Sequence, residues 1–300
     1  MSQVAIIMRS CNDKGVIERT LAALQTQTYK DWSLYNIDSS SKDGTAEAIA
    51  ELATIQTIIP GSSYVPGRVL NLGATQALSP YLIFLNSDCV PVNESWLENM
   101  VKGLDKSPVV YGRQIAREDA WMLYERDYNY SFPEKGKEPR RRWWHNHSFQ
   151  NFFSMANCGM HRSIWEQIPF DNDLQYSEDI EWSTRVRNAS YPITYLPDAI
   201  VEHSHNYTSA QCYRRFFGEG YADGLVFERR RLRDSFVMMV VIPYLNALRN
   251  DFVYALQHRK HDWYLSIPLR WSMNWGRYKG MQEAQTSGGF LPSILKPGGA

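Results

Sequence analysis

The first 115 residues alternate between short apolar runs and segments of helical periodicity, and this alternation limits the fold more than any other feature of the sequence. Ile17, Leu21 and Leu24, for example, recur at helical spacing and so share one face of a helix. The apolar runs that we read as strands are 4–8, 32–37, 55–59, 81–85 and 109–115. Repeated strand–helix–strand units are typical of a mostly parallel sheet flanked by helices. The sequence therefore predicts an α/β fold.

The pattern changes in the rest of the chain. Residues 116–150 are polar and aromatic without clear periodicity, so we expect a long functional loop or a lid there. A short helix near Ser163, a helix over 177–188 and strands over 193–196 and 199–202 should complete the sheet domain. We predict one domain over 1–206, with halves 1–115 and 116–206, and a C-terminal helical region with a loose tail over 207–300.

Charge and cysteine spacing exclude several classes of protein. Lys plus Arg and Asp plus Glu both number 32, and no common nucleic-acid motif occurs, so we expect no nucleic-acid partner. The cysteines form no C-x-x-C pair, which argues against a disulfide framework and against a zinc site. They are Cys11, Cys89, Cys158 and Cys212. Reduced thiols favour a cytoplasmic location.

No segment predicts export or a membrane span. The N-terminal apolar stretch resembles a strand rather than a signal peptide, and the apolar run 236–248 contains Pro243 and is too short to cross a bilayer. Basic and aromatic residues around Arg140–Trp144 and in the C-terminal helices suit peripheral association with the inner face of the plasma membrane. A solvated loop and packed helices are the alternative, which we favour for 140–142.

Acidic residues end or follow two of the predicted strands and open a later helix. Asp38 ends the second strand, Asp88 follows the run 81–85, and Glu178-Asp179 begins the helix over 177–188. Ligands of open parallel sheets bind at the carboxyl ends of the strands, which gives these side chains a claim to function. Each residue taken singly could instead be a helix cap, a turn former or a favourable charge in a first helical turn.

Six motifs in a fixed order are more specific than any one of them. Together they resemble the family-2 glycosyltransferases of the GT-A fold, over roughly residues 4–220. VAIIMRSCND resembles the opening strand of that family, IDSSSKDGT its aspartate-rich turn, and GRVLNLGATQA its N-x-G helix. FLNSDCVP stands at the D-x-D motif, YSEDIEW at the acidic pair and IVEHSHNYT at the late metal-binding histidine.

The resemblance implies an inverting, metal-dependent transferase with a Rossmann-like nucleotide-binding half, an acceptor half and a C-terminal helical appendage. It implies Asp179 and Glu178 as catalytic residues. The metal, Mn²⁺ or Mg²⁺, is assigned to Asp88 with His203 or His205. The donor-binding residues are Arg9, Ser10, Asp13, Asp38, Asn71, Ser87 and Asp88. One departure is Asn86, which replaces the first acid of the D-x-D motif and leaves Asp88 as its only anionic ligand.

The chemistry of these residue types agrees with the resemblance. A carboxylate such as Asp88 suits a hard divalent ion, and imidazole as a further ligand favours Mn²⁺. If His203 and His205 end a strand, both lie on one face, and His203 is our first choice. Asp38 could accept the N3–H of uracil or thymine, which predicts a UDP or dTDP donor. Asp179 could deprotonate the acceptor hydroxyl.

Within the family, the amino-acid sequence of residues 177–208 resembles that of bacterial rhamnosyltransferases. This resemblance implies dTDP-β-L-rhamnose as donor and a saccharide or lipid-linked saccharide as acceptor. A UDP-hexose or UDP-N-acetylhexosamine transferase is the alternative. A non-catalytic sugar-binding protein of the same fold is another alternative, for which Asn86 is the only hint. A dinucleotide-dependent oxidoreductase is excluded, because RSCNDKG rather than G-x-G-x-x-G follows the first strand.

Overall fold

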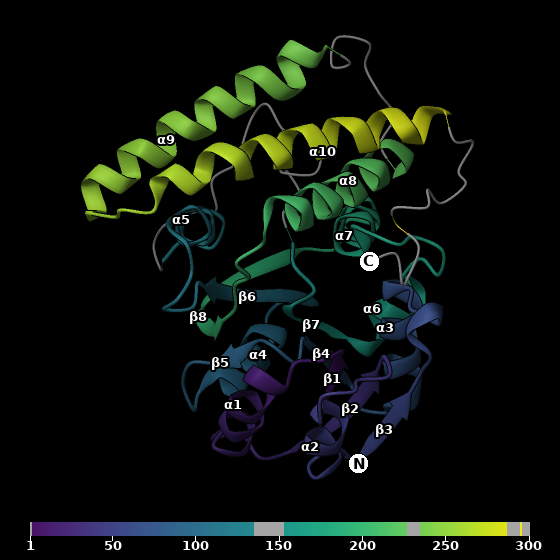
Figure 1. The fold of residues 1–300 in the computed structure, drawn as a ribbon. Coiled ribbons are helices and arrows are strands. Elements are labelled where there is room, and N and C mark those ends of the chain that lie inside the picture. Colours follow the sequence, from purple (N-terminus) through teal and green to yellow (C-terminus); the bar gives the residue numbers. More distant parts are fainter. Residues whose placement is uncertain (1, 135–152, 227–234, 287–294, 296–300) are drawn as a thin grey trace. The chain divides into compact units, whose positions relative to one another are not determined.

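A computed structural model describes residues 2–134, 153–226, 235–286 and 295 of the chain. The chain forms two compact units (Figure 1). The sheet unit comprises residues 1–115, 132–174 and 178–203. The helical unit comprises residues 116–131, 175–177 and 204–300.

The sheet unit is built on eight strands in the order β3-β2-β1-β4-β7-β6-β8-β5. The strands are β1 (Val4–Ser10), β2 (Trp32–Asp38), β3 (Ile55–Ile58), β4 (Tyr81–Leu85), β5 (Val90–Pro91), β6 (Val109–Ile115), β7 (Asn157–His161) and β8 (Ile193–Glu202). Strands β3, β2, β1 and β4 run parallel, as do β6 and β8, whereas β7 is antiparallel to both β4 and β6. The prediction of a mostly parallel sheet is confirmed.

Apolar side chains from the strands and the flanking helices fill the core of the sheet unit. Alternate residues of β1, namely Val4, Ile6 and Met8, are fully buried and join a cluster that includes Leu24 and Trp96. The helices are α1 (Lys14–Gln25), α2 (Thr45–Ala50), η1 (Gly61–Ser63), α3 (Pro66–Gln76), α4 (Trp96–Leu104), α6 (Arg162–Gln167) and α7 (Glu178–Asn188). Strands buried on both faces explain why their sequences are continuous apolar runs.

Strand β8 differs from the two separate strands predicted over 193–196 and 199–202. It is one strand with an irregularity, since Leu196 pairs with Gly112 whereas Ile200 pairs with the next residue, Arg113. Pro197 lies in the extra segment, where its missing N–H removes no ladder hydrogen bond. The polar break in the sequence therefore marks a bulge and not a turn.

The helical unit contains α5 (Met122–Ser131), α8 (Ser209–Val226), η4 (Val237–Val241), α9 (Ile242–His258), η5 (Trp263–Leu265) and α10 (Ser266–Thr286). Helices α8 and α10 lie side by side (Figure 1) and approach each other closely at glycines. A Cβ atom added at Gly276 would lie 2.5 Å from the carbonyl oxygen of Tyr213. A Cβ atom added at Gly280 would overlap the carbonyl oxygen of Phe217. Only glycine allows this backbone contact.

Helix α5 corrects the prediction of a loop or lid for residues 122–131, whereas residues 135–150 of that predicted segment lie outside the described residues. The charged residues of α5 are partly buried in an ion network, so the helix has no polar stripe at helical spacing that a search of the sequence would find. Arg126 donates to Asp251 of α9 at 2.6 Å, and Arg270 of α10 donates to Asp251 at 2.8 Å and to Asp127 at 2.5 Å. The network fixes α5 against α9 and α10. Residues 140–144, which include the Arg-Arg-Arg-Trp-Trp run, lie outside the described residues.

Candidate active site

Parallel pairing brings the carboxyl ends of β1, β2 and β4 to one edge of the sheet. Ser10 lies directly opposite Asp38 in the register of β1 and β2, and Asn86 to Asp88 follow β4. Polar residues predicted from the strand ends are thus brought together by the topology.

Asp38 is fully buried and closes the turn after β2. Its Oδ2 accepts hydrogen bonds from the hydroxyls of Ser10 at 2.7 Å and Ser41 at 2.6 Å, and its Oδ1 accepts one from the Ser41 backbone N–H at 2.7 Å. A carboxylate has about four acceptor positions, so one on Oδ1 is left for a further donor. The turn-forming role and a ligand-binding role are therefore compatible.

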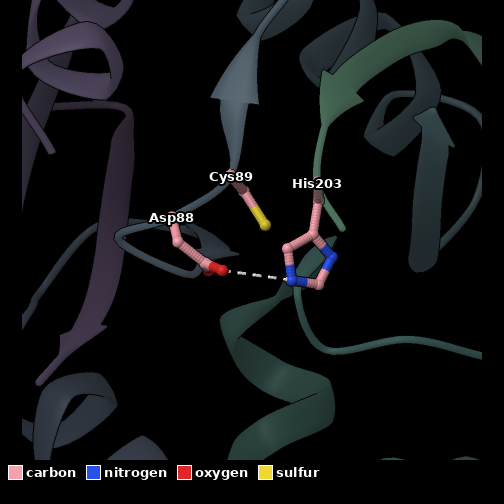
Figure 2. A group of neighbouring side chains, drawn as sticks. All are labelled: Asp88, Cys89 and His203. Atoms are coloured by element: carbon pink, nitrogen blue, oxygen red, sulfur yellow. Dashed lines mark ion pairs between the residues drawn. The ribbon is translucent and has the colours of Figure 1, made fainter. Parts of the chain in front are cut away.

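Two short segments far apart in the sequence place Asp88, Cys89 and His203 side by side. Val90 of β5 pairs with Glu202 of β8 in an antiparallel register, so the residues just before β5 meet the residue just after β8. Figure 2 shows the Asp88 carboxylate facing the His203 ring, with the Cys89 thiol directed toward the same space. The Asp88 Oδ2 and His203 Nε2 atoms are 3.4 Å apart, and the three potential ligand atoms lie within 4.8 Å of one another. This group can hold a metal ion.

The His203 ring is held from its far side by Gln114 of β6. The Nδ1 atom lies 2.8 Å from Gln114 Oε1, and the Gln114 amide in turn donates to the Ser154 hydroxyl at 2.9 Å. In this orientation Nδ1 donates its hydrogen, which leaves Nε2 as the atom facing Asp88. Partners of this kind orient the histidine ligands of metal sites.

His205 belongs to the helical unit. Because β8 ends at Glu202, neither histidine belongs to the strand, and the expectation that they share a strand face is wrong. The His205 ring stacks on Tyr207 with centroids 5.2 Å apart. It lines a small pocket of the helical unit together with Arg117, Asp119, Ser204, Asn206, Tyr207 and Gln211.

Arg9 links the strand edge to the acidic pair. Its Nε donates to Asn86 Oδ1 at 2.9 Å, and its Nη1 donates to Glu178 at 2.7 Å and to the Tyr64 hydroxyl at 3.3 Å. Burial acts to lower the pKa of the guanidinium, but Tyr64, Glu178 and Asp179 together raise the pKa above its ordinary value. Arg9 therefore remains a cation. Tyr64 was not predicted as a site residue, because nothing in its local sequence marks it.

The acidic pair opens helix α7, as predicted. Glu178 is buried and paired with Arg9, while Asp179 Oδ1 accepts a hydrogen bond from the Ile180 N–H at 2.8 Å. The two carboxylates thus differ in surroundings, because Glu178 forms the ion pair with the Arg9 guanidinium and Asp179 is not part of that pair.

Two further residues predicted to bind the donor, Asp13 and Asn71, form hydrogen bonds that connect neighbouring segments of the sheet unit. Asp13 Oδ2 accepts hydrogen bonds from the Cys11 N–H at 3.1 Å and the Ser87 hydroxyl at 2.5 Å, so it joins the start of α1 to the segment before Asp88. Its side chain makes no capping bond to helix α1. The Asn71 amide is engaged by Trp165, Phe170 and Asn172, which anchors the loop after α6 to α3.

Comparison with known proteins agrees with this geometry. Residues 5–165, more than half of the chain, match the family described as Glycosyl transferase family 2. The chain is 26% identical over 224 residues to the O-antigen chain rhamnosyltransferase RfbN of Salmonella typhimurium strain LT2, which covers 73% of this chain and 71% of that protein. It is 30% identical over 207 residues to the O-antigen chain rhamnosyltransferase WbaN of Salmonella anatum, covering 66% of this chain and 64% of that protein.

Solved structures show the same fold. The mannosyltransferase PcManGT from Pyrobaculum calidifontis, in complex with GDP-Man and Mn²⁺, superposes with a TM-score of 0.62 at 16% identity, over 95% of this chain and 88% of that one. S. aureus TarS 1–349 in complex with UDP superposes with a TM-score of 0.52 at 13% identity, over 95% and 92% of the two chains. The prediction of a GT-A fold is confirmed, and the chain belongs to glycosyl transferase family 2.

Proposed function

We propose that this glycosyltransferase transfers L-rhamnose from dTDP-β-L-rhamnose, with inversion, to a saccharide or lipid-linked saccharide acceptor in the assembly of a bacterial surface polysaccharide. The observation that carries the proposal is the convergence of Asp38, Asp88 and the Arg9–Glu178 pair at one edge of the sheet. The similarity to two O-antigen rhamnosyltransferases supports the choice of sugar.

A divalent ion, Mn²⁺ or Mg²⁺, fits the donor set at this edge. Asp88 and His203 would hold it, since one carboxylate oxygen and one imidazole nitrogen face each other at 3.4 Å. When bound, such an ion neutralises the charge that develops on the departing nucleoside diphosphate. Arg9, a partly buried cation bonded to Asn86, adds positive charge next to the same segment, where it would help to neutralise the departing diphosphate.

The other acidic residues of the site have separate roles in this proposal: Asp38 binds the nucleobase of the donor, and Asp179 is the catalytic base. Asp38 accepts the N3–H of thymine or uracil through the free position on Oδ1, a donor that cytosine and adenine lack. Asp179 takes the proton from the acceptor hydroxyl as that oxygen attacks the anomeric carbon from the face opposite the leaving group. Glu178 positions Arg9 rather than transferring a proton.

We expect turnover of dTDP-β-L-rhamnose in the presence of Mn²⁺ and its loss on addition of a chelator, because the leaving diphosphate is then not neutralised. Release of nucleoside diphosphate is measured for dTDP-rhamnose, UDP-glucose, UDP-galactose and UDP-N-acetylglucosamine under identical conditions. Turnover of a UDP-sugar without turnover of dTDP-rhamnose would contradict the donor assignment. Binding without release from any donor would instead indicate a non-catalytic sugar-binding protein.

The helical unit supports peripheral membrane association. No described helix combines the length and the apolar character needed to span a bilayer. Nevertheless one face of α9 exposes apolar side chains at positions i, i+3, i+10, i+11 and i+14, each with 42–65% of its surface accessible. These residues are Ile242, Leu245, Phe252, Val253 and Leu256. Arg249 and Arg259 are exposed on the same helix and at its end, which suits an anionic lipid surface.

We expect the protein to float with phosphatidylglycerol vesicles, and the combined change Leu245→Ser, Phe252→Ser and Leu256→Ser to weaken this binding at least about tenfold, because three apolar side chains lose their burial in lipid. Leu78→Ser, which alters an equally exposed leucine of the sheet unit, is the matched control. Unchanged flotation of the triple variant, or a dimer of the wild type that the variant loses, would contradict the membrane assignment.

A further inference from the structure

Cys89 lies beside the two residues to which the proposed function assigns the metal. We propose that the Cys89 thiolate is a third protein ligand, so that this site binds Zn²⁺ and Co²⁺ through nitrogen, oxygen and sulfur together. The inference rests on the metal site of the proposed function and adds a ligand and a metal preference to it. Soft thiolate ligands select zinc and related ions, whereas Mn²⁺ and Mg²⁺ prefer oxygen.

The position of Cys89 follows from the backbone. Val90 pairs with Glu202, so the residue before Val90 and the residue after Glu202 lie next to each other at the end of the antiparallel bridge. The Cys89 Sγ, an Asp88 carboxylate oxygen and a His203 ring nitrogen all lie within 4.8 Å of one another. Figure 2 shows the three side chains directed toward one space.

The distance between Asp88 and His203 fits a shared cation. Two ligands about 2.0 Å from a tetrahedral zinc ion are about 3.3 Å apart, whereas an N–H···O hydrogen bond is usually about 2.7–3.2 Å long. The observed Oδ2–Nε2 distance is 3.4 Å. Gln114 Oε1, 2.8 Å from Nδ1, orients the ring so that Nε2 is directed toward the Asp88 carboxylate, and both atoms are placed to contact one cation.

Burial gives the site one protected side and one open side. Cys89 is fully buried, whereas the side chains of Asp88 and His203 keep 10% and 11% of their surface accessible. Three protein ligands with an open position are the arrangement of catalytic zinc sites, in which a substrate or water oxygen completes the sphere. The open position here would take an oxygen of the nucleoside diphosphate.

This inference reverses an expectation drawn from cysteine spacing. The sequence argued against a zinc site because its four cysteines form no C-x-x-C pair. A mixed site needs only one cysteine, and its other ligands come from an adjacent aspartate and from a histidine 114 positions further along the chain. The alternative is that Cys89 is a small apolar residue of the hydrophobic core, since it belongs to the same buried cluster as Trp96 and Val201.

The test is cobalt absorption spectroscopy on the metal-free full-length protein. Co²⁺ should produce a near-ultraviolet thiolate-to-cobalt charge-transfer band in the wild type and in Cys158→Ser, which changes another fully buried thiol of the sheet unit. Cys89→Ser should lose the band and bind Zn²⁺ at least about tenfold more weakly, a difference of about 1.4 kcal/mol, while its Mn²⁺ affinity changes less. A wild type without the band, or a Cys89→Ser protein that keeps it, would overturn the proposal.

A second measurement needs no variant and so does not depend on how well Cys89→Ser folds. Zinc-edge X-ray absorption of the wild type should show a sulfur scatterer at about 2.3 Å, and a shell of nitrogen and oxygen alone would overturn the proposal. Failure of the glycosyltransferase assignment is seen separately, as absent donor turnover with Mn²⁺. A sulfur-bound zinc in a protein without turnover would leave the metal site intact and remove only the activity.

Discussion

Replacing Asp179 with asparagine is expected to lower sugar transfer by about 10²- to 10⁴-fold, the usual range for a positioned acid or base, and to leave donor binding close to that of the wild type. The asparagine keeps the shape of the side chain and can still accept the Ile180 N–H hydrogen bond, but it cannot accept the proton. Transfer rates and calorimetric donor binding are measured on the same preparations, and the anomeric configuration of the product is read by NMR.

Glu181→Gln is the matched control for this variant. Glu181 lies in the same first turn of α7 but pairs with Arg185 at 2.5 Å, so its loss changes the helix-terminal charge without touching the proposed base. Its transfer rate should stay near that of the wild type. Near wild-type turnover by Asp179→Asn, or a product that keeps the configuration of the donor, would remove the inverting mechanism proposed for Asp179.

Asp251→Ala is expected to lower the free energy of unfolding by about 3–5 kcal/mol, because Arg126 and Arg270 both lose their most buried counterion and are left with the single carboxylate of Asp127. Asp251 is 1% exposed and accepts hydrogen bonds from Arg126 at 2.6 Å and from Arg270 at 2.8 and 3.0 Å. Urea unfolding followed by circular dichroism gives the change in the midpoint.

The exposed Arg68–Asp173 ion pair provides the comparison, since it has a similar distance of 2.7 Å but side chains that are 55% and 86% exposed. Asp173→Ala should change stability by no more than about 1 kcal/mol, as surface pairs usually do. Equal effects of the two substitutions would show that burial of the Asp251 network contributes no additional stability.

The strands of the first half were predictable because both faces of the sheet are covered. A buried parallel strand such as β4 is apolar at almost every position, and its limits, Tyr81–Leu85, agree with the sequence pattern. Strand ends carry polar side chains in such folds, which is why Asp38 and Asp88 stood out. Local patterns were sufficient for these elements.

The parts that were missed depend on contacts between distant residues. Helix α5 was taken for a loop because its charges are paired with α9 and α10 in the interior of the helical unit. The proximity of Cys89 and His203 comes from the register of β5 on β8, and a bridge of two residues leaves no periodic pattern. The hydrogen bonds of Arg9 to Asn86 and Glu178 likewise require the folded sheet.

The ion pair between Arg9 and Glu178 closes a loop of 169 positions, and this has a consequence for the order of assembly during synthesis. Contacts between distant residues form only after the intervening chain exists and has been brought together. A growing chain that has not yet reached Glu178 carries the Arg9 guanidinium without this carboxylate partner, and one that has not reached His203 has Asp88 and Cys89 without the neighbouring histidine. Nascent chains that end before His203 therefore cannot have an assembled site, even though β1 to β4 are complete by Leu85.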